Sequence, residues 1–314
     1  MAAKTYGQAF MAPLIEAARQ NIYSGSQIIT ERPLGKSTGS NDTMRIPTWN
    51  SNNNQLPDDL GRAANAEAKE IVSGSFKYVD VQAKNYSAKK TVDISQEYDQ
   101  RVVDAGSTNE AERLYIQELL GQVNVKMEHY NAALLSTNTN YLAANRESIS
   151  TSGDRWDSGG DPVEDTEIML NTVEDSCGIR PNVIAYDYDV WREILKNALV
   201  VARIPDKTTK QVTFNWYKTL FPDVDQIIIR SGKYKTTASG TLTPFYSKKA
   251  GVYVVDSNER KQAFAGLFRD PTRDDKTRRM LTEEGYSYKF IHDRYRAISV
   301  IDNSCGGIIE NCIS

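Results

Sequence analysis

The segment from Ser107 to Asn138 constrains the fold most, because it predicts one helix of unusual length. Ser107 and Glu110 form an S-x-x-E capping box, in which each side chain can accept a hydrogen bond from an orphan backbone N–H. Apolar side chains then recur with spacings of mostly three to five residues, which predicts one broad buried face. These are Leu114, Leu119, Leu120, Val123, Met127, Tyr130 and Leu134. At 1.5 Å per residue, roughly 30 residues extend about 45 Å. Such a helix either crosses a large domain or presents a face to another subunit.

The composition is that of a water-soluble chain large enough for one big domain or two ordinary ones. It has 314 residues, a net charge of -3 and a mean hydropathy of -0.54. The sequence contains no run of 18 apolar residues, so we predict no membrane-spanning helix. The N-terminus also lacks the pattern of a signal peptide. Salt-sensitive binding to duplex DNA needs clustered Lys and Arg, so an acidic chain is a poor candidate. Three cysteines without framework spacing predict free thiols in a reducing compartment.

The first 36 residues cannot form a core of their own. A short amphipathic piece around Phe10 and Leu14 is followed by Ile28, Ile29 and then Pro33. Two readings stay open: a flexible terminus, or an arm that becomes ordered by lying on a neighbour.

Residues 37–76 form a second segment that cannot bury itself. The segment is rich in Ser and Asn and contains the strand-like sequence TMRIPTW over residues 43–49. Long polar connections of this kind are usually functional or disordered. We predict a projecting two-stranded hairpin whose candidate contact residues for a partner are Arg45, Trp49, Arg62 and Lys69.

A compact mixed module is predicted on either side of the long helix. Residues 76–98 alternate as strands, and residues 141–160 are expected to be a loop. A second helix is predicted to begin after Asp161, a natural N-cap, with Pro162 at the first position and Glu164 completing a capping box. Gly178 is predicted to end this helix in the left-handed conformation. We expect Ile168, Leu170 and Val173 to line the inner side of this helix.

The rest of the chain predicts short strands and helices. A buried strand at 183–186 leads into a helix capped by Asp187 or Asp189, and another helix is expected at 214–221. Apolar positions predicted to lie inside the first of these helices are Val190, Trp191, Ile194, Leu195 and Leu199. Further strands are expected near 225–230, 251–256, 263–269 and 285–302.

Enzymatic sites are not indicated by the sequence. Gly35-Lys36-Ser37-Thr38 resembles the tail of a phosphate-binding loop, but Thr30 stands where that loop needs glycine. Neither His129 nor His292 has a metal-ligand partner at suitable spacing. The carboxylates Asp270, Asp274 and Asp275 alternate with arginines, which is typical of a solvated or salt-bridged face. We therefore predict no catalytic residue, cofactor or metal.

The order of these segments resembles the major capsid proteins of tailed bacteriophages, which have the Hong Kong 97-type fold. The resemblance covers nearly the whole chain. The residues that carry it are Met44-Arg45-Ile46-Pro47, Val92-Asp93-Ile94-Ser95, Trp156, Asp161-Pro162, Gly178, Pro181-Asn182, Trp191 through Ile204-Pro205, and Asp293-Arg294-Tyr295-Arg296.

The resemblance implies an α+β fold with four parts. These are an N-terminal arm (1–36), an extended loop (37–76), a peripheral domain (77–160 and 269–314) with a long spine helix at about 107–138, and an axial domain (161–268). It implies pentamers and hexamers that tile an icosahedral shell around phage DNA, with nonspecific DNA contact. The virion is the implied location, with assembly in the host cytoplasm.

The resemblance also bears on partners. Because Met1 lies a few dozen residues before the loop, we expect no fused scaffolding segment, but a separate scaffold protein, a portal and possibly a decoration protein. Some relatives join subunits by a Lys–Asn isopeptide bond. The only lysine between Thr43 and Ser75 is Lys69, so we do not expect this cross-link.

Two alternatives remain at this point. An encapsulin-like compartment would use the same fold to enclose enzyme cargo, and the material that co-purifies would distinguish it. A hydrolase or nucleotide-binding enzyme would use Gly35–Ser37 or the 270–275 cluster, and alanine at Lys36 would then abolish activity.

Overall fold

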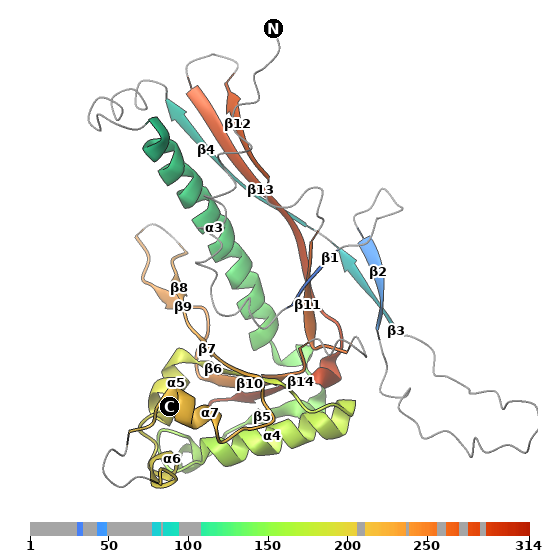
Figure 1. Ribbon diagram of the computed structural model, residues 1–314, viewed down its shortest axis with the longest axis vertical. Helices are drawn as coiled ribbons and strands as arrows, with labels where there is room; N and C mark the ends of the chain where they lie inside the picture. Colours follow the sequence, from blue (N-terminus) through green and yellow to red (C-terminus); the bar gives the residue numbers. More distant parts are fainter. Residues whose placement is uncertain are drawn as a thin grey trace, which may run out of the picture.

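Two five-stranded sheets are connected by one long helix (Figure 1). The computed structural model describes residues 30–33, 43–48, 77–82, 84–93, 108–205, 211–236, 239–255, 262–269, 276–282 and 287–314. The long helix, α3 (Thr108–Ser136), agrees with the predicted helix at 107–138. The predicted α+β class is therefore confirmed for the described chain.

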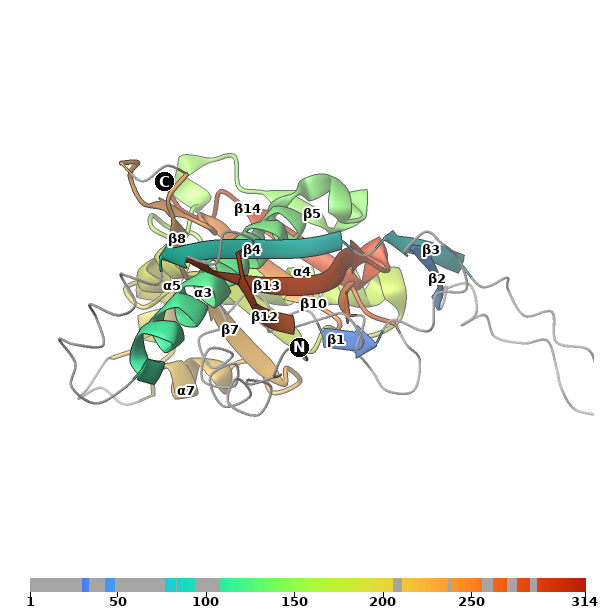
Figure 2. The ribbon, with the colours of Figure 1, turned by 90° about the horizontal axis from the view of Figure 1, so that it is seen from above.

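The first sheet is built around one very long strand, β13 (Ser287–Val300). Its neighbours are β4 (Lys84–Asp93) on one side and β12 (Lys276–Leu281) and β11 (Ala265–Arg269) on the other, all antiparallel to it. The short strand β1 (Thr30–Pro33) runs parallel to β11 at the outer edge. Seen from above, β4 lies along β13 (Figure 2).

A separate two-stranded ribbon leads away from this sheet. Strand β2 (Thr43–Thr48) pairs antiparallel with β3 (Lys77–Gln82), so that Thr43 lies opposite Gln82 and Thr48 opposite Lys77. Both views show the ribbon beyond the end of β4, away from α3 (Figures 1 and 2). Strand β2 confirms the strand predicted within 43–49, but its partner β3 lies at 77–82, beyond the predicted hairpin segment 37–76. Residues 49–76 lie outside the described residues.

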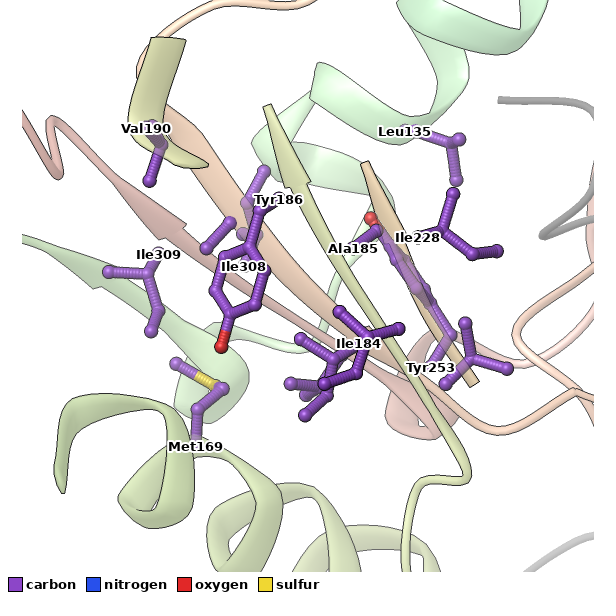
Figure 3. Close-up of a cluster of buried hydrophobic side chains, with 14 of the residues drawn as sticks. Leu135, Met169, Ile184, Ala185, Tyr186, Val190, Ile228, Tyr253, Ile308 and Ile309 are labelled. Atoms are coloured by element: carbon purple, nitrogen blue, oxygen red, sulfur yellow. The ribbon is translucent and has the colours of Figure 1, made fainter. Parts of the chain in front are cut away.

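The second sheet holds the larger core. Its order is β5 (Arg146–Ser148), β14 (Gly306–Glu310), β10 (Lys249–Tyr253), β6 (Val183–Asp187) and β7 (Gln226–Arg230). All five residues of β6 are buried, because the strand has neighbours on both sides and layers on both faces. Helix α4 (Pro162–Cys177) covers one face, and Figure 3 shows Met169 of this helix beside Tyr186.

The remaining described elements are short helices, one small hairpin and 3₁₀ turns. The helices are α5 (Tyr188–Ile194), α6 (Ala198–Ala202) and α7 (Phe214–Lys218), and a small hairpin is formed by β8 (Lys233–Tyr234) and β9 (Thr243–Pro244). The 3₁₀ turns are η3 (Asn138–Asn140), η4 (Ala143–Asn145), η5 (Ser152–Asp154) and η6 (Asn303–Cys305).

The predicted ends of α4 are confirmed in detail. The Asp161 carboxylate accepts hydrogen bonds from the backbone N–H groups of Val163 (3.0 Å) and Glu164 (3.3 Å), with Pro162 at the first position. Gly178 ends the helix with φ of 76°, a left-handed conformation that glycine adopts without a Cβ clash.

Several burial predictions are wrong. Ile168 is 51% exposed and Leu199 is 43% exposed, because each lies on the solvent side of its helix, away from the sheet. Leu195 is only partly buried. Tyr130 is 38% exposed although its spacing places it on the inner stripe of α3, and its ring contacts the ring of Tyr86 in β4 at 5.4 Å between centres.

The predicted loop at 141–160 is also wrong in part. It contains β5, which pairs parallel with β14, and three of its residues belong to η4. Trp156 is buried because its backbone N–H donates to the Cys312 carbonyl (2.8 Å) and its indole N–H donates to Asp165 (2.6 Å). The segment is therefore fixed by partners remote in sequence, which local patterns cannot indicate.

Candidate functional site

Two features stand out as candidates for function: the region where α3 meets the second sheet, and a groove between α3 and the first sheet. The residues of α3 divide between two cores. Ile116, Leu119 and Leu120 pack with Phe290 of the first sheet. Val123, Met127 and Leu135 belong to the core of the second sheet. The helix thus joins the two sheets through its own apolar face.

A buried ion pair joins the ends of two neighbouring strands of the second sheet. Asp187 ends β6 and Arg230 ends the neighbouring strand β7, directly opposite in register. The Arg230 guanidinium lies 2.7 Å from the Asp187 carboxylate, and both side chains are 1% exposed. The Asp187 carboxylate also accepts a hydrogen bond from the backbone N–H of Lys249 (2.9 Å). Charges this deeply buried are rare unless they are paired.

A group of tyrosines extends this ion pair towards α3. Arg230 donates to the Tyr253 hydroxyl (3.2 Å), which lies 3.1 Å from the Tyr141 hydroxyl. Tyr141 in turn donates to the Leu135 carbonyl at the end of α3 (2.5 Å). The Arg230 guanidinium also lies over the Tyr246 ring, 5.0 Å from its centre.

Two further contacts join the helix to the sheet. The Tyr246 hydroxyl donates to the buried Glu128 carboxylate on α3 (2.6 Å). The Lys249 ammonium donates to the Ser136 carbonyl (2.7 Å) and pairs with Glu310 of β14 (2.5 Å). We name the set Glu128, Tyr141, Asp187, Arg230, Tyr246, Lys249, Tyr253 and Glu310 the polar joint. It fixes the end of α3 on the second sheet through directional bonds.

The electrostatics of the polar joint follow from its burial. Desolvation raises the pKa of Asp187 to about 6, although the nearby Arg230 opposes the shift. Burial, and then the Glu128 charge, raise the pKa of Tyr246 well above its ordinary value. Burial raises the pKa of Tyr141 in the same way. Tyr246 and Tyr141 therefore remain neutral hydrogen-bond donors at physiological pH.

Sequence reasoning did not find the polar joint. The available signal was a charged residue at the end of an otherwise apolar strand, in VIAYD and in QIIIR. Charges in such positions are either exposed or paired, and only the order of the strands shows which.

Of the four predicted contact residues, the described structure contains Arg45 alone. Arg45 lies in β2, opposite Asp80 of β3 in the register of the ribbon. Trp49, Arg62 and Lys69 lie outside the described residues. Their role as inter-subunit contacts remains a prediction.

A groove opens between α3 and the first sheet, with a volume of about 540 Å³. The helix contributes Tyr130, Ala133 and Leu134, and the residues after its end contribute Thr137 and Asn140. The opposite wall is the backbone and side chains of residues 297–300 of β13, and the end wall is Gln82, Lys84 and Tyr86. The rings of Tyr86 and Tyr130 meet at 5.4 Å between their centres.

The other candidate sites considered from sequence carry no assembled chemistry. His292 is buried, with its Nδ1 atom 2.9 Å from the Thr277 hydroxyl. His129 packs edge-on against Tyr234. Among the described residues, no group of three His, Cys, Asp or Glu could hold a metal ion. Residues 35–38 and 270–275 lie outside the described ranges.

No helix within the described ranges has the length and apolar character needed to cross a membrane. Searches with protein-family models and against curated proteins find no match to this sequence.

Solved structures do match over almost the full length. A phage-related protein from Bordetella bronchiseptica RB50 has a TM-score of 0.74 at 15% identity, and the match covers 96% of each chain. The subunit of a virus-like particle from Pyrococcus furiosus has a TM-score of 0.53 at 11% identity, covering 97% of this chain and 100% of that one. A putative capsid protein of a prophage in E. coli CFT073 has a TM-score of 0.52 at 10% identity, covering 96% and 97%.

Identities this low show a shared fold. The two sheets, the long helix between them and the projecting ribbon are therefore the fold of phage capsid proteins, as the resemblance of the sequence implied.

Proposed function

We propose that this chain is a major capsid protein, which self-assembles as pentamers and hexamers into an icosahedral shell that encloses phage DNA. The observation that carries the proposal is the structural match over nearly the whole chain to a phage-related protein and to a putative prophage capsid protein.

The arrangement of the described chain supports a building block better than an enzyme. A rigid helix shared by two cores gives a plate-like unit a fixed shape, and a ribbon leads away from it. Many weak contacts between such units can hold a shell together, since each bound contact raises the effective concentration of the next. The proposed role is therefore structural and non-enzymatic.

The proposed division of the subunit follows the sequence ranges given above: arm 1–36, extended loop 37–76, peripheral part 77–160 and 269–314, and axial part 161–268. Strands β5 and β14 come from the peripheral ranges and pair in the sheet of β10, β6 and β7. Strand β11, from the end of the axial range, pairs with β13. The two parts would thus exchange strands, which would make their relative position hard to change.

The proposed partners are copies of the same chain, a separate scaffold, a portal and possibly a decoration protein. DNA contact would be weak and nonspecific, since the net charge of -3 gives little attraction to phosphate. The virion is the proposed location, after assembly in the host cytoplasm.

Electron microscopy of the purified protein, together with sedimentation velocity, tests the proposal. Round shells or rings of five and six subunits are the expected products, formed by the protein alone or after co-expression with a separate scaffold protein. A slowly sedimenting monomer under both conditions would contradict the proposal. Nucleic acid inside shells formed during infection, rather than an enzyme, would separate a phage head from a cargo compartment.

A further inference from the structure

Two of the three cysteines meet in the core of the second sheet, although they are far apart in the sequence. Cys177 is the last residue of α4, and Cys305 is the last residue of the 3₁₀ turn η6, directly before β14. Both side chains are 0% exposed, and the two thiols are hydrogen-bond partners. Both are free thiols. Two thiols in contact can be joined by a disulfide, provided that the backbone holds the two residues close together.

The side chain of Asn145 fixes the backbone beside both cysteines. Its amide N–H groups donate to the carbonyls of Ser304 (2.9 Å) and Gly306 (3.1 Å), which flank the second cysteine. Its carbonyl oxygen accepts a hydrogen bond from the hydroxyl of Ser176 (2.7 Å), which precedes the first cysteine. Asn145 is itself fully buried, so these bonds are shielded from water. One side chain therefore connects the residues next to both thiols and holds the two segments side by side.

The third cysteine offers a comparison inside the same core. Cys312 is fully buried as well, but its thiol donates to the Ile309 carbonyl (3.4 Å) rather than to another thiol. Burial raises the pKa of the Cys312 thiol well above its ordinary value. In contrast, the hydrogen bond with Cys305 lowers the pKa of the Cys177 thiol, while the same bond and burial raise the pKa of the Cys305 thiol. Because the thiolate is the reactive form of cysteine, Cys177 is the sulfur best prepared to react.

We propose that Cys177 and Cys305 are an oxidation site, at which an intramolecular disulfide locks the end of α4 to the turn that precedes β14. The inference goes beyond the proposed function, because it concerns the chemistry of one folded subunit. Strand β14 pairs with β5 on one side and with β10 on the other, so it holds the end of the chain within the second sheet. A covalent bond beside the first residue of β14 would keep this strand in place.

A peroxide is the class of oxidant that fits a buried pair, since hydrogen peroxide is little larger than water. The Cys177 thiolate attacks one oxygen of hydrogen peroxide, an S–O bond forms, the O–O bond breaks, and the product is a sulfenic acid. The hydroxide that leaves takes up the proton that Cys177 lost and becomes water. The Cys305 sulfur then attacks the Cys177 sulfur, so that the S–S bond forms, the S–O bond breaks, and hydroxide leaves with the Cys305 proton as water. The two thiols are thereby oxidised, and one peroxide is reduced to water.

Thiol counting on the unassembled full-length chain tests the pair. After treatment with hydrogen peroxide, titration in denaturant should find one free thiol, since two of the three are joined. Mass spectrometry should find a pair of peptides linked through positions 177 and 305. Cys312→Ala should form the same disulfide, whereas Cys177→Ala and Cys305→Ala should form none. A disulfide that contains Cys312 in the unaltered folded chain would overturn the proposal.

Refolding gives a second test, in which burial does not limit access of the oxidant. The urea-unfolded chain is diluted into a buffer of reduced and oxidised glutathione, and its disulfides are mapped at equilibrium. The Cys177–Cys305 disulfide should be the main product, because the folded chain holds this pair in contact. With urea retained, Cys305 and Cys312 should pair instead, since they are closest in sequence. A refolded chain that keeps three free thiols, or that joins Cys305 to Cys312, would overturn the proposal.

Thermal stability tests whether the disulfide acts as a lock. The bond would close a long loop of chain, so the oxidised protein should melt about 5–10 °C above the same protein after reduction. Each variant is compared with itself before and after oxidation, so that any packing lost through the alanine cancels. Cys312→Ala should show the full rise, and Cys305→Ala should show none. A mapped disulfide without a rise in melting temperature would overturn the proposed lock.

The outcomes separate this inference from the shell function. In the proposed virion the lock would close after release from the reducing host cytoplasm, and this setting alone rests on the proposed function. Failure to form the disulfide would reject the oxidation site and leave the shell function standing. A chain that forms the disulfide but neither shells nor rings would reject the shell function and leave the oxidation site standing.

Discussion

Replacing Arg230 by methionine removes one partner of the buried ion pair and leaves the other in place. Arg230 and Asp187 are each 1% exposed, and their charged atoms lie 2.7 Å apart. Methionine keeps much of the volume of the arginine stem, so the main loss is the charge and the hydrogen bond to Tyr253. The Asp187 carboxylate would then face a low-dielectric core without its counter-ion.

The expected cost is large because the pair is buried. Removing one partner of a buried ion pair typically lowers the free energy of unfolding by about 3–5 kcal/mol. The matched control is Arg203→Met, since Arg203 also pairs with an aspartate, Asp161, at 2.6 Å but is 36% exposed. A pair that exposed contributes only about 0–1 kcal/mol. A second control, Arg230→Met with Asp187→Leu, removes both charges and should recover part of the loss.

Urea unfolding of the unassembled chain, followed by tryptophan fluorescence, measures these differences. The reasoning is refuted if Arg230→Met and Arg203→Met lose equal free energy, or if the double variant is less stable than Arg230→Met alone. Either result would mean that water or local rearrangement compensates Asp187 in the folded state. Electron microscopy of Arg230→Met at low temperature would then show whether folding and assembly fail together.

Three further predictions concern single side chains. Asn197→Ala should lower the free energy of unfolding by about 2–4 kcal/mol in urea, because the side chain caps α6 and its amide donates to the carbonyls of Trp156 (2.8 Å) and Gly160 (2.9 Å). Asn197→Ser keeps a capping oxygen and should recover about 1 kcal/mol of this loss. Desolvation raises the pKa of Asp187 to about 6 in the folded state. The stability that protonated Asp187 contributes is therefore complete below the unfolded pKa and is lost as the pH rises through 6. Relative to Asp187→Asn, the wild-type protein should gain stability as the pH falls from 7 to 4, and a difference that stays constant would contradict this. Gly307→Ala should cost about 1–3 kcal/mol, since the new Cβ would lie 2.5 Å from Met169 Sδ, and calorimetry of the two proteins checks it.

The features that could be predicted from sequence depend on neighbours within a few residues. The caps of α4 at Asp161 and Gly178 are examples, because cap geometry is set by the same turn of chain. The length of α3 is another example, because apolar residues that recur at helical spacing over so many residues are compatible with few structures other than a helix. The structure contains these elements in the predicted order, and the resemblance to phage capsid proteins therefore predicted the fold correctly.

The features that could not be predicted depend on which strands become neighbours. Asp187 and Arg230 are 43 residues apart and meet only because β6 and β7 pair in parallel register. Strand β5 exists because β14 supplies its partner from the C-terminus. Tyr130 fits the buried period of α3 but is exposed where β4 ends. A period identifies a face of a helix, and only the tertiary structure shows what covers it.

The polar joint fixes the angle at which α3 lies on the second sheet. Apolar contacts alone would let α3 slide on the second sheet at little cost, because burial depends on area and has no direction. Hydrogen bonds from Tyr246 to Glu128 and from Tyr141 to the end of α3 have preferred directions, so they fix the angle between helix and sheet. In a closed shell of repeated copies a small error in that angle accumulates at each contact. In the shell that we propose, a subunit held in one shape by these bonds would keep that error small.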